Sequence, residues 1–220
     1  MEEIPQYCLE TVCFLPENFL RKTVNEPFIQ KIMSIAIESN QWIPGNPNRF
    51  EPDYFCDGVP FEFTVASDRK KKGNYIQKFY AGRYQTEDAQ DDIFCYVKES
   101  IQQKLTKRYF VPDVHLCVLC LMDLTYWVMD EYGSCTYCLT DYPRKEFFQW
   151  IKHECIETNT FNNVFLIFPD IYAKWWVWDV LSGDRVSIAL SKSEINSGQY
   201  PFWMEKGRYE EIARRPKNMD

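Results

Sequence analysis

A short acidic stretch, Pro52 to Thr64, constrains the fold more than any other part of the chain. Its Asp57-Gly58 dipeptide favours a two-residue type I′ turn, because both central positions of that turn need a positive φ, and aromatic and β-branched residues flank it. Counting outward from such a turn places Asp53 directly opposite Glu62. The sequence therefore predicts a β-hairpin that carries two carboxylates on one face.

The two carboxylates of this hairpin have two interpretations. Like charges that face each other cost stability unless a cation or a proton relieves them. Oxygen ligands about 5 Å apart suit Mg²⁺ or Mn²⁺, and Thr64 lies on the same face, two residues after Glu62. The same pattern also fits the solvated face of an edge hairpin, because exposed acids are common.

The composition limits the class of protein. With 220 residues, 45% of them hydrophobic, the chain can bury one sizeable core, so we expect a single domain over residues 1–220. No apolar run reaches the roughly 18 residues that span a bilayer, so we expect no membrane association, and the N-terminus does not resemble a signal peptide. Nine cysteines, an odd number, indicate reduced thiols and a cytoplasmic location. The net charge of −7 argues against a generally basic nucleic-acid coat, although a local basic groove remains compatible with it.

Hydrophobic periodicity predicts a mixed α/β (α+β) fold. We expect a helix over residues 25–39 with Asn25 as its N-cap, and a long amphipathic helix from Thr86, in which Ile93, Val97 and Ile101 recur every four residues. The apolar run over residues 114–121 indicates a buried central strand. The other expected elements are a helix over 140–156, a strand over 163–168, a hairpin of 174–181 with 185–190, and short helices over 75–84 and from 206. This order predicts a mixed central sheet flanked by helices on both faces.

Two cysteine pairs, Cys117-x-x-Cys120 and Cys135-x-x-Cys138, have nearly the spacing of a four-thiolate zinc site. A zinc knuckle needs a tight turn, and the apolar residues around Cys117 and Cys120 include no Gly or Pro to form one. In a strand, those two side chains would also face opposite sides. We therefore expect buried free thiols and no structural zinc.

Other catalytic or cofactor-binding motifs are missing. His115 and His153 have no obvious nucleophile as a partner, so the sequence does not support a Cys/His or Ser/His hydrolase. Neither a P-loop nor a dinucleotide-binding fingerprint occurs, so we expect no nucleotide cofactor. The Trp-rich segment over residues 174–178 could stack nucleobases, although aromatic residues in strands more often pack in the core.

At Pro52-Asp53, Asp57-Gly58 and Glu62-Phe63-Thr64, the sequence resembles the PD-(D/E)XK nuclease superfamily, which has the restriction-endonuclease-like fold. The resemblance covers roughly residues 25–125 and implies an αβββαβ core, in which a helix supplies one acid and the hairpin supplies the others. Residues 160–220 would then add C-terminal strands and a short helix.

The resemblance also implies an activity, the hydrolysis of DNA phosphodiester bonds with Mg²⁺ or Mn²⁺. Asp53 and Glu62 would be the metal-binding acids, and Glu38 would be the acid from the preceding helix. The bound metal would lower the pKa of the attacking water and polarise the phosphate.

Thr64 departs from the family pattern, because it stands where the family has a lysine. That lysine orients or activates the attacking water and stabilises developing negative charge. A lysine from elsewhere could reach the same space: Lys70, Lys71 or Lys72 after the strand, or Lys104 on the long helix. Alternatively, the site is catalytically degenerate and the domain binds another protein, for example in a defence or immunity setting. Substrate strandedness, protein partner and oligomeric state stay open.

Overall fold

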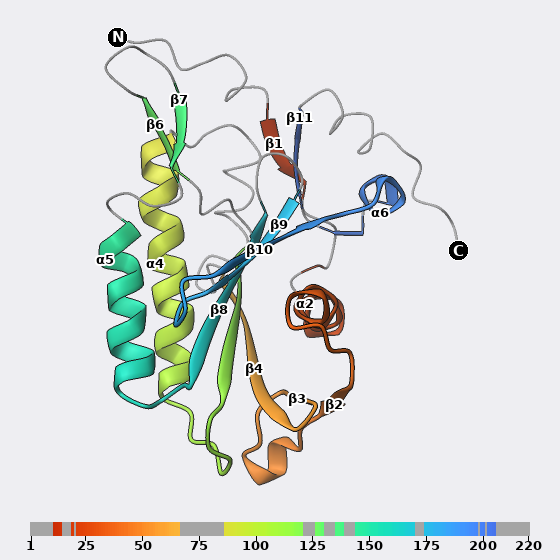
Figure 1. Ribbon diagram of the computed structural model, residues 1–220, viewed down its shortest axis with the longest axis vertical. Helices are drawn as coiled ribbons and strands as arrows, with labels where there is room; N and C mark the ends of the chain where they lie inside the picture. The colour runs from red at the N-terminus through yellow and green to blue at the C-terminus, as the bar shows by residue number, and fades with distance from the viewer. Residues whose placement is uncertain are drawn as a thin grey trace.

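A seven-stranded mixed sheet forms the centre of the computed structural model (Figure 1). The structure describes residues 11–14, 19, 21–66, 86–120, 126–129, 135–138, 144–169, 174–197, 199–200 and 202–205. The strands of the central sheet are β2 (Trp42–Pro44), β3 (Tyr54–Cys56), β4 (Val59–Ala66), β5 (His115–Cys120), β8 (Asn163–Pro169), β9 (Lys174–Asp179) and β10 (Arg185–Ala189). The helices are α2 (Lys22–Ala36), α4 (Thr86–Leu105), α5 (Arg144–Ile151) and α6 (Lys192–Ser197), with a 3-10 turn η1 (Pro47–Arg49) and a π-helical turn η2 (Lys152–Glu157).

The strand order in the sheet is β10-β9-β8-β5-β4-β3-β2. Strands β4, β5 and β8 are mutually parallel, whereas β2, β3, β9 and β10 pair antiparallel with their neighbours. Two further ladders join β1 (Thr11–Phe14) with β11 (Phe202–Glu205) and β6 (Tyr126–Met129) with β7 (Cys135–Cys138). The predicted mixed α/β sheet is therefore confirmed.

The acidic hairpin forms in the predicted register. Asp57 and Gly58 have φ values of 49° and 81°, as a type I′ turn requires. Cys56 pairs with Val59, and Tyr54 pairs with Phe61. Continuing this register by one residue places Asp53 opposite Glu62.

Helices cover both faces of the sheet: α2 lies on one side, and α4 and α5 lie on the other (Figure 1). The alternation of side chains in β5 shows the two layers. Leu116 and Val118 pack with the α4–α5 layer, whereas Cys117 and Leu119 pack with the α2 layer. Because β5 is buried on both faces, its sequence is a continuous apolar run.

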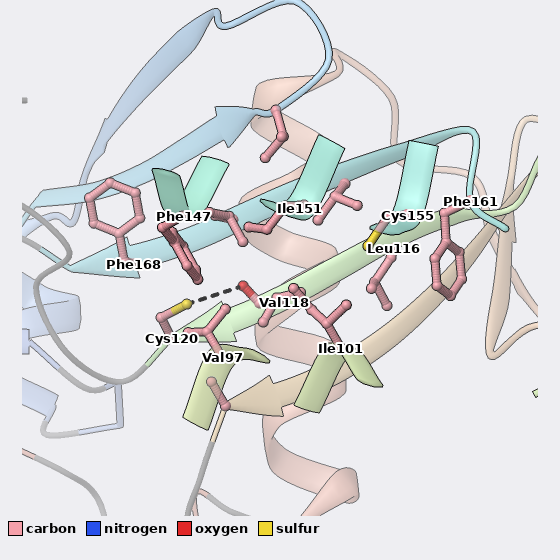
Figure 2. Packing of buried hydrophobic residues seen from close by; sticks show 14 of the residues in the cluster. Val97, Ile101, Leu116, Val118, Cys120, Phe147, Ile151, Cys155, Phe161 and Phe168 are labelled. Atoms are coloured by element: carbon pink, nitrogen blue, oxygen red, sulfur yellow. Dashed lines mark hydrogen bonds between the residues drawn. The ribbon is translucent and has the colours of Figure 1, made fainter. Parts of the chain in front are cut away.

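The α4–α5 layer is an interdigitated apolar core (Figure 2). Val97 and Ile101 of α4 and Ile151 of α5 are each completely buried, and they close over β5 and β8. Residues four apart on α4 point to the same face. This layer thereby fixes which side of α4 meets β4, and it sets the position of Lys104 one turn further on.

The helix before the hairpin begins earlier than predicted. α2 begins at Lys22, with Arg21 as its N-cap, so the prediction that Asn25 caps this helix is wrong. Asn25 is 3% exposed and lies inside the helix, as does Pro27. The tertiary burial of Phe28, which is 1% exposed, outweighs the local preference of Asn and Pro for a helix start.

Most of the other helices and strands agree with the sequence-based expectation, and a few do not. Four expected elements occur close to their predicted bounds: the long helix α4, the helix over 140–156 (observed as α5 and η2), the strand β8 and the hairpin β9–β10. The β1–β11 and β6–β7 ladders and α6 were not predicted, and the segment 40–50, expected to be a loop, contains the short strand β2 and the turn η1. The expected short helices over 75–84 and from 206 lie outside the described residues. Within the part of the chain that the structure describes, no helix has the length and apolar composition needed to cross a bilayer.

Candidate functional site

The two acids of the hairpin are held together by backbone hydrogen bonds. The Asp53 amide donates to Glu62 Oε2 at 3.3 Å, and the Phe63 amide donates to Asp53 Oδ2 at 2.9 Å. Each acid therefore accepts from the opposite strand. Glu62 is only 1% exposed, whereas the Asp53 side chain keeps 16% of its surface accessible. Asp53 is thus the more accessible of the two carboxylates.

A close backbone approach positions the start of β3. The Gly45 amide donates to the Asp53 carbonyl at 3.0 Å. A Cβ atom on Gly45 would lie 2.0 Å from the carbonyl oxygen of Pro52, a distance that backbone atoms cannot tolerate. Glycine is therefore required at position 45 for β2 to approach the segment that holds Asp53.

Two lysines contact the buried carboxylate, Lys104 from the last turn of α4 and Lys107 from the segment that follows it. Lys104 Nζ forms an ion pair with Glu62 Oε1 and lies 3.7 Å from Asp53 Oδ2. Lys107 Nζ lies 2.5 Å from the same Glu62 oxygen. Lys104 is 7% exposed, whereas the side chain of Lys107 is 46% exposed. Of the lysines proposed from the sequence, Lys104 belongs to the described residues, and it contacts both acids.

Burial and charge act in opposite directions on these groups. Burial disfavours the Asp53 carboxylate, but Lys104 and the hydrogen bond from Phe63 outweigh it, so the pKa of Asp53 lies below its ordinary value. For Lys104 the balance reverses: burial lowers its pKa despite the nearby Glu62 and Asp53. For Lys107, burial is outweighed by the contact with Glu62, which raises its pKa.

Helix α2 contributes a different acid from the predicted one. Lys22 Nζ lies 3.2 Å from Glu26 Oε1 and 3.3 Å from Asp53 Oδ1, so it bridges the helix and the hairpin. The Tyr54 hydroxyl donates to Glu26 Oε2 at 3.0 Å. Glu26, on the first turns of α2, is therefore the helix acid that is linked to Asp53.

Glu38 lies at the other end of α2, where we expected the acid. It is exposed, follows the last helical residue, Ala36, and has a φ of 54°. The neighbouring Ser39 donates to Asp57 in the hairpin turn. The turn is four residues from Asp53, or roughly 13 Å along a strand. The structure therefore places Glu38 at the turn and not beside Asp53.

Two buried hydroxyl groups lie in the same region. Thr64 is 5% exposed, and its Oγ1 has no hydrogen-bond partner. The Tyr109 hydroxyl is buried near Glu62 without a well-aligned hydrogen bond. Burial, together with the negative charges of Glu62 and Asp53, raises the pKa of Tyr109, so this side chain stays a neutral phenol.

The expected metal ion would need oxygen ligands. Mg²⁺ is commonly held by one or two carboxylates together with water and substrate phosphate, and Asp53 and Glu62 supply such a pair. Among the described residues, no group of three or more His, Cys, Asp or Glu side chains could hold a metal ion. A metal at this pair would share Glu62 with Lys104 and Lys107. Asp53 and Glu62 are the residues that would hold Mg²⁺ or Mn²⁺, with water or phosphate completing the coordination.

An open cleft of about 620 Å³ adjoins Asp53. The residues that line it come from α2, from the segment between β2 and β3, and from the segment after α4: Lys22, Gly45, Pro47, Phe50, Glu51, Pro52, Asp53, Thr106, Lys107, Arg108 and Tyr109. Three of them are cations and two are anions. The lining therefore carries a net positive charge, although the whole chain is acidic.

The sequence did not single out four residues of this site: Lys22, Glu26, Lys107 and Tyr109. Lys22 and Glu26 have the i, i+4 spacing of a helical ion pair, a signal that the misplaced helix start concealed. Lys107 follows Lys104 by three residues, which is also a helical spacing. Lys70, Lys71 and Lys72 lie outside the described residues.

The other sequence candidates occupy structural positions. Cys117 and Cys120 point to opposite faces of the sheet, as predicted, so they cannot share one zinc ion. Burial raises the pKa of both thiols. His115 stacks against Phe61 and Phe165, and burial lowers its pKa. These side chains belong to the packing of the sheet.

The ion pairs described above form one charge cluster, which consists of Lys22, Glu26, Asp53, Glu62, Lys104 and Lys107. Neither the remaining histidine nor the Trp-rich segment forms part of this charge cluster. His153 is exposed and pairs with Glu157 at 3.0 Å on the π-helical turn. Trp175 is fully buried, and Trp178 packs on Phe148 with ring centroids 3.9 Å apart. The Trp-rich strand therefore belongs to the core.

Comparisons with protein-family models, with curated proteins and with solved structures find no match to this chain.

Proposed function

We propose that this protein hydrolyses phosphodiester bonds in DNA with Mg²⁺ or Mn²⁺, using the charge cluster on the hairpin. One observation carries the proposal: Lys104 reaches Asp53 and Glu62 from α4. It supplies the positive charge that Thr64 cannot provide. Two acids and one lysine beside an accessible cleft form the group that metal-assisted phosphoryl transfer requires.

The order of elements supports the restriction-endonuclease-like interpretation. From α2 through β2, β3, β4 and α4 to β5, the chain has the sequence αβββαβ. The first three of these strands are antiparallel neighbours, and the fourth pairs parallel with β4. We propose that this segment is the nuclease-like core, with β8, β9 and β10 extending its sheet.

Each side chain has a proposed role. A divalent ion held by Asp53 and Glu62 would activate the attacking water and offset charge on the phosphate. Lys104 would stabilise the negative charge that develops on the phosphoryl oxygens, an effect that burial strengthens. Lys22 would hold the Asp53 carboxylate in place through its link to Glu26. Lys107 would meet the incoming phosphate at the cleft.

The test is a cleavage assay with purified protein that has been stripped of metal and then supplied with Mg²⁺ or Mn²⁺. Asp53→Asn and Lys104→Gln should each lower the cleavage rate by at least about 100-fold, in the range seen when an electrostatic catalytic group is removed. Lys98→Gln is the matched control, because Lys98 lies on the same helix but packs over Trp150 at 5.2 Å. It should cleave at the wild-type rate.

Two results would contradict the nuclease function. One is an absence of metal-dependent cleavage by the wild-type protein on plasmid, duplex and single-stranded DNA. The other is cleavage that survives Asp53→Asn, since this would place the activity elsewhere or in a contaminant.

The contacts already made by the Glu62 carboxylate support a second candidate function. Glu62 Oε1 is paired with Lys104 and Lys107, and Oε2 accepts from the Asp53 amide, so both oxygens already have partners. This arrangement favours a catalytically degenerate domain that binds another protein. Calorimetry with Mn²⁺ separates the two functions: a binding heat that Asp53→Asn removes supports the nuclease, and an absence of heat supports the degenerate domain.

A further inference from the structure

Two phenylalanines at the rim of the Asp53 cleft are exposed to an unusual degree. Phe50 is 58% exposed and Phe110 is 77% exposed, although both side chains are large and apolar. Their ring centroids are 5.1 Å apart with an interplanar angle of 78°, an edge-to-face pair. Phe50 also lines the cleft. The pair therefore extends the cleft wall outward as an aromatic surface.

The backbone holds this pair in position. The Phe110 amide donates to the Phe50 carbonyl at 3.3 Å, which links the segment after α4 to the segment before β3. Phe50 has a φ of 53° and ends the η1 turn. A left-handed conformation costs a bulky residue about 1 kcal/mol or more, so the fold maintains the exposure of this ring at some cost.

Cations lie next to the aromatic surface. Lys107 and Arg108 line the same cleft and precede Phe110 by three and two residues. Lys22 lines the cleft beside Asp53. Positive groups that follow a phosphate backbone, combined with exposed rings, are the features by which proteins bind single-stranded nucleic acid. In a duplex, the faces of the bases are stacked on each other and are not accessible to such rings.

We infer that the cleft binds single-stranded DNA, with an unpaired base stacked on Phe110, the more exposed of the two rings, and the adjoining phosphates on Lys107 and Arg108. The inference deepens the proposed function, on which it rests, by naming the substrate as a single strand or an unpaired end. The same cleft would lead the backbone to the Asp53 and Glu62 carboxylates.

The test measures binding without cleavage. Fluorescence anisotropy of a labelled oligothymidylate of about 12 nucleotides, in buffer with EDTA, reports the Kd for the single strand. Phe110→Ala should weaken this binding by about 5- to 150-fold, the range for loss of one aromatic stacking contact. Phe110→Trp should restore it, because a larger ring keeps the stacking surface. A duplex of the same length should bind more weakly than the single strand.

One control variant and one phosphate-contact variant separate stacking from other effects. Leu181→Ala removes an apolar side chain that is 50% exposed on the turn after β9, three strands from β4 in the sheet, and should leave the Kd unchanged. Arg108→Gln should weaken binding and reduce its salt dependence, because it removes one phosphate contact. The free energy of unfolding of each variant is measured in parallel to exclude loss of the fold.

Several results would overturn the inference. These are a wild-type protein that does not bind the single strand, a duplex that binds as tightly as the single strand, or a Phe110→Ala variant that binds the single strand with the wild-type Kd. None of them depends on cleavage. A protein that cleaves duplex DNA but fails this binding test would disprove only the inference, and one that binds the strand but never cleaves it would disprove only the nuclease function.

Discussion

Alternate residues of strand β4 meet two different environments. Phe61 and Phe63, each 3% exposed, pack into the α2 layer among apolar side chains. Glu62 and Thr64, which are 1% and 5% exposed, point toward α4. Glu62 forms an ion pair with Lys104 there, whereas the Thr64 hydroxyl has no hydrogen-bond partner. One face of the strand is therefore a hydrophobic core, and the other has a polar end.

The difference between these faces separates stability from function. Burial of phenylalanine contributes directly to stability. A buried ion pair contributes little net stability, because desolvation offsets the Coulomb attraction, yet removing one partner is costly. The α4 face thus holds charged groups that add little net stability, which supports the proposal that they have a function.

The largest expected effect is on the apolar face. Phe63→Ala should lower the free energy of unfolding by about 3–5 kcal/mol, because it leaves a cavity between β4 and α2. Urea unfolding measures the change. Val59→Ala on the same strand, where the side chain is 39% exposed, is the control and should change stability by about 0.5 kcal/mol or less. Equal effects of the two variants would refute the assignment of that face as core.

Glu62→Ala should cost about 3 kcal/mol, because it leaves Lys104 buried with only the more distant Asp53. Glu62 is 1% exposed, so solvent cannot compensate for the lost ion pair. The double variant Glu62→Ala with Lys104→Met should recover most of the loss, since it removes the unpaired charge. A double variant as unstable as the single one would argue against the ion pair.

Thr64→Val should raise the free energy of unfolding by about 1 kcal/mol, because the buried hydroxyl has no partner and valine has the same shape. Thr158→Val is the control: its hydroxyl donates to the Glu154 carbonyl at 2.8 Å, so it should show no gain. Destabilisation by Thr64→Val would mean that the hydroxyl is satisfied by an ordered water.

The smallest effect is the dependence of stability on acid pH. Because the pKa of Asp53 is lower in the folded state than the unfolded value of about 3.9, the unfolded chain binds more protons as the pH falls. The contribution of Asp53 is therefore complete above about pH 5 and is lost progressively below pH 4. Between about pH 5 and about pH 3, urea unfolding should therefore show a smaller decrease in the free energy of unfolding for Asp53→Asn than for the wild type. An equal decrease would mean that Asp53 is not ion-paired.

Much of the architecture could be predicted because its signals are local or periodic. The φ preference of Asp57-Gly58 sets the hairpin register, and the four-residue spacing of Val97 and Ile101 sets the long helix. The start of α2 could not be predicted in this way. There the burial of Asn25 and Phe28 overrides the capping preference of Asn25, and burial depends on residues far away in the chain.

The site, too, has a part that local sequence signals predict and a part that depends on residues far apart in the chain. The pairing of Asp53 with Glu62 was predictable because only nine residues and one turn separate them. The sequence offered four candidate lysines and one helix acid, and it could not decide among them. The core packing favoured for the Trp-rich strand agrees with the burial of Trp175, whereas nothing local in the sequence indicated that Phe50 and Phe110 would be exposed.

The sequence by itself thus determined the acidic hairpin, because a two-residue turn dictates which side chains face each other. Only the tertiary structure decided what surrounds it: Lys104 meets Glu62 across 42 residues of chain, and Lys22 brings Glu26 to Asp53. The physical reason is that a turn acts through local backbone angles. The partner from a helix depends instead on how that helix is rotated when its apolar face packs on the sheet.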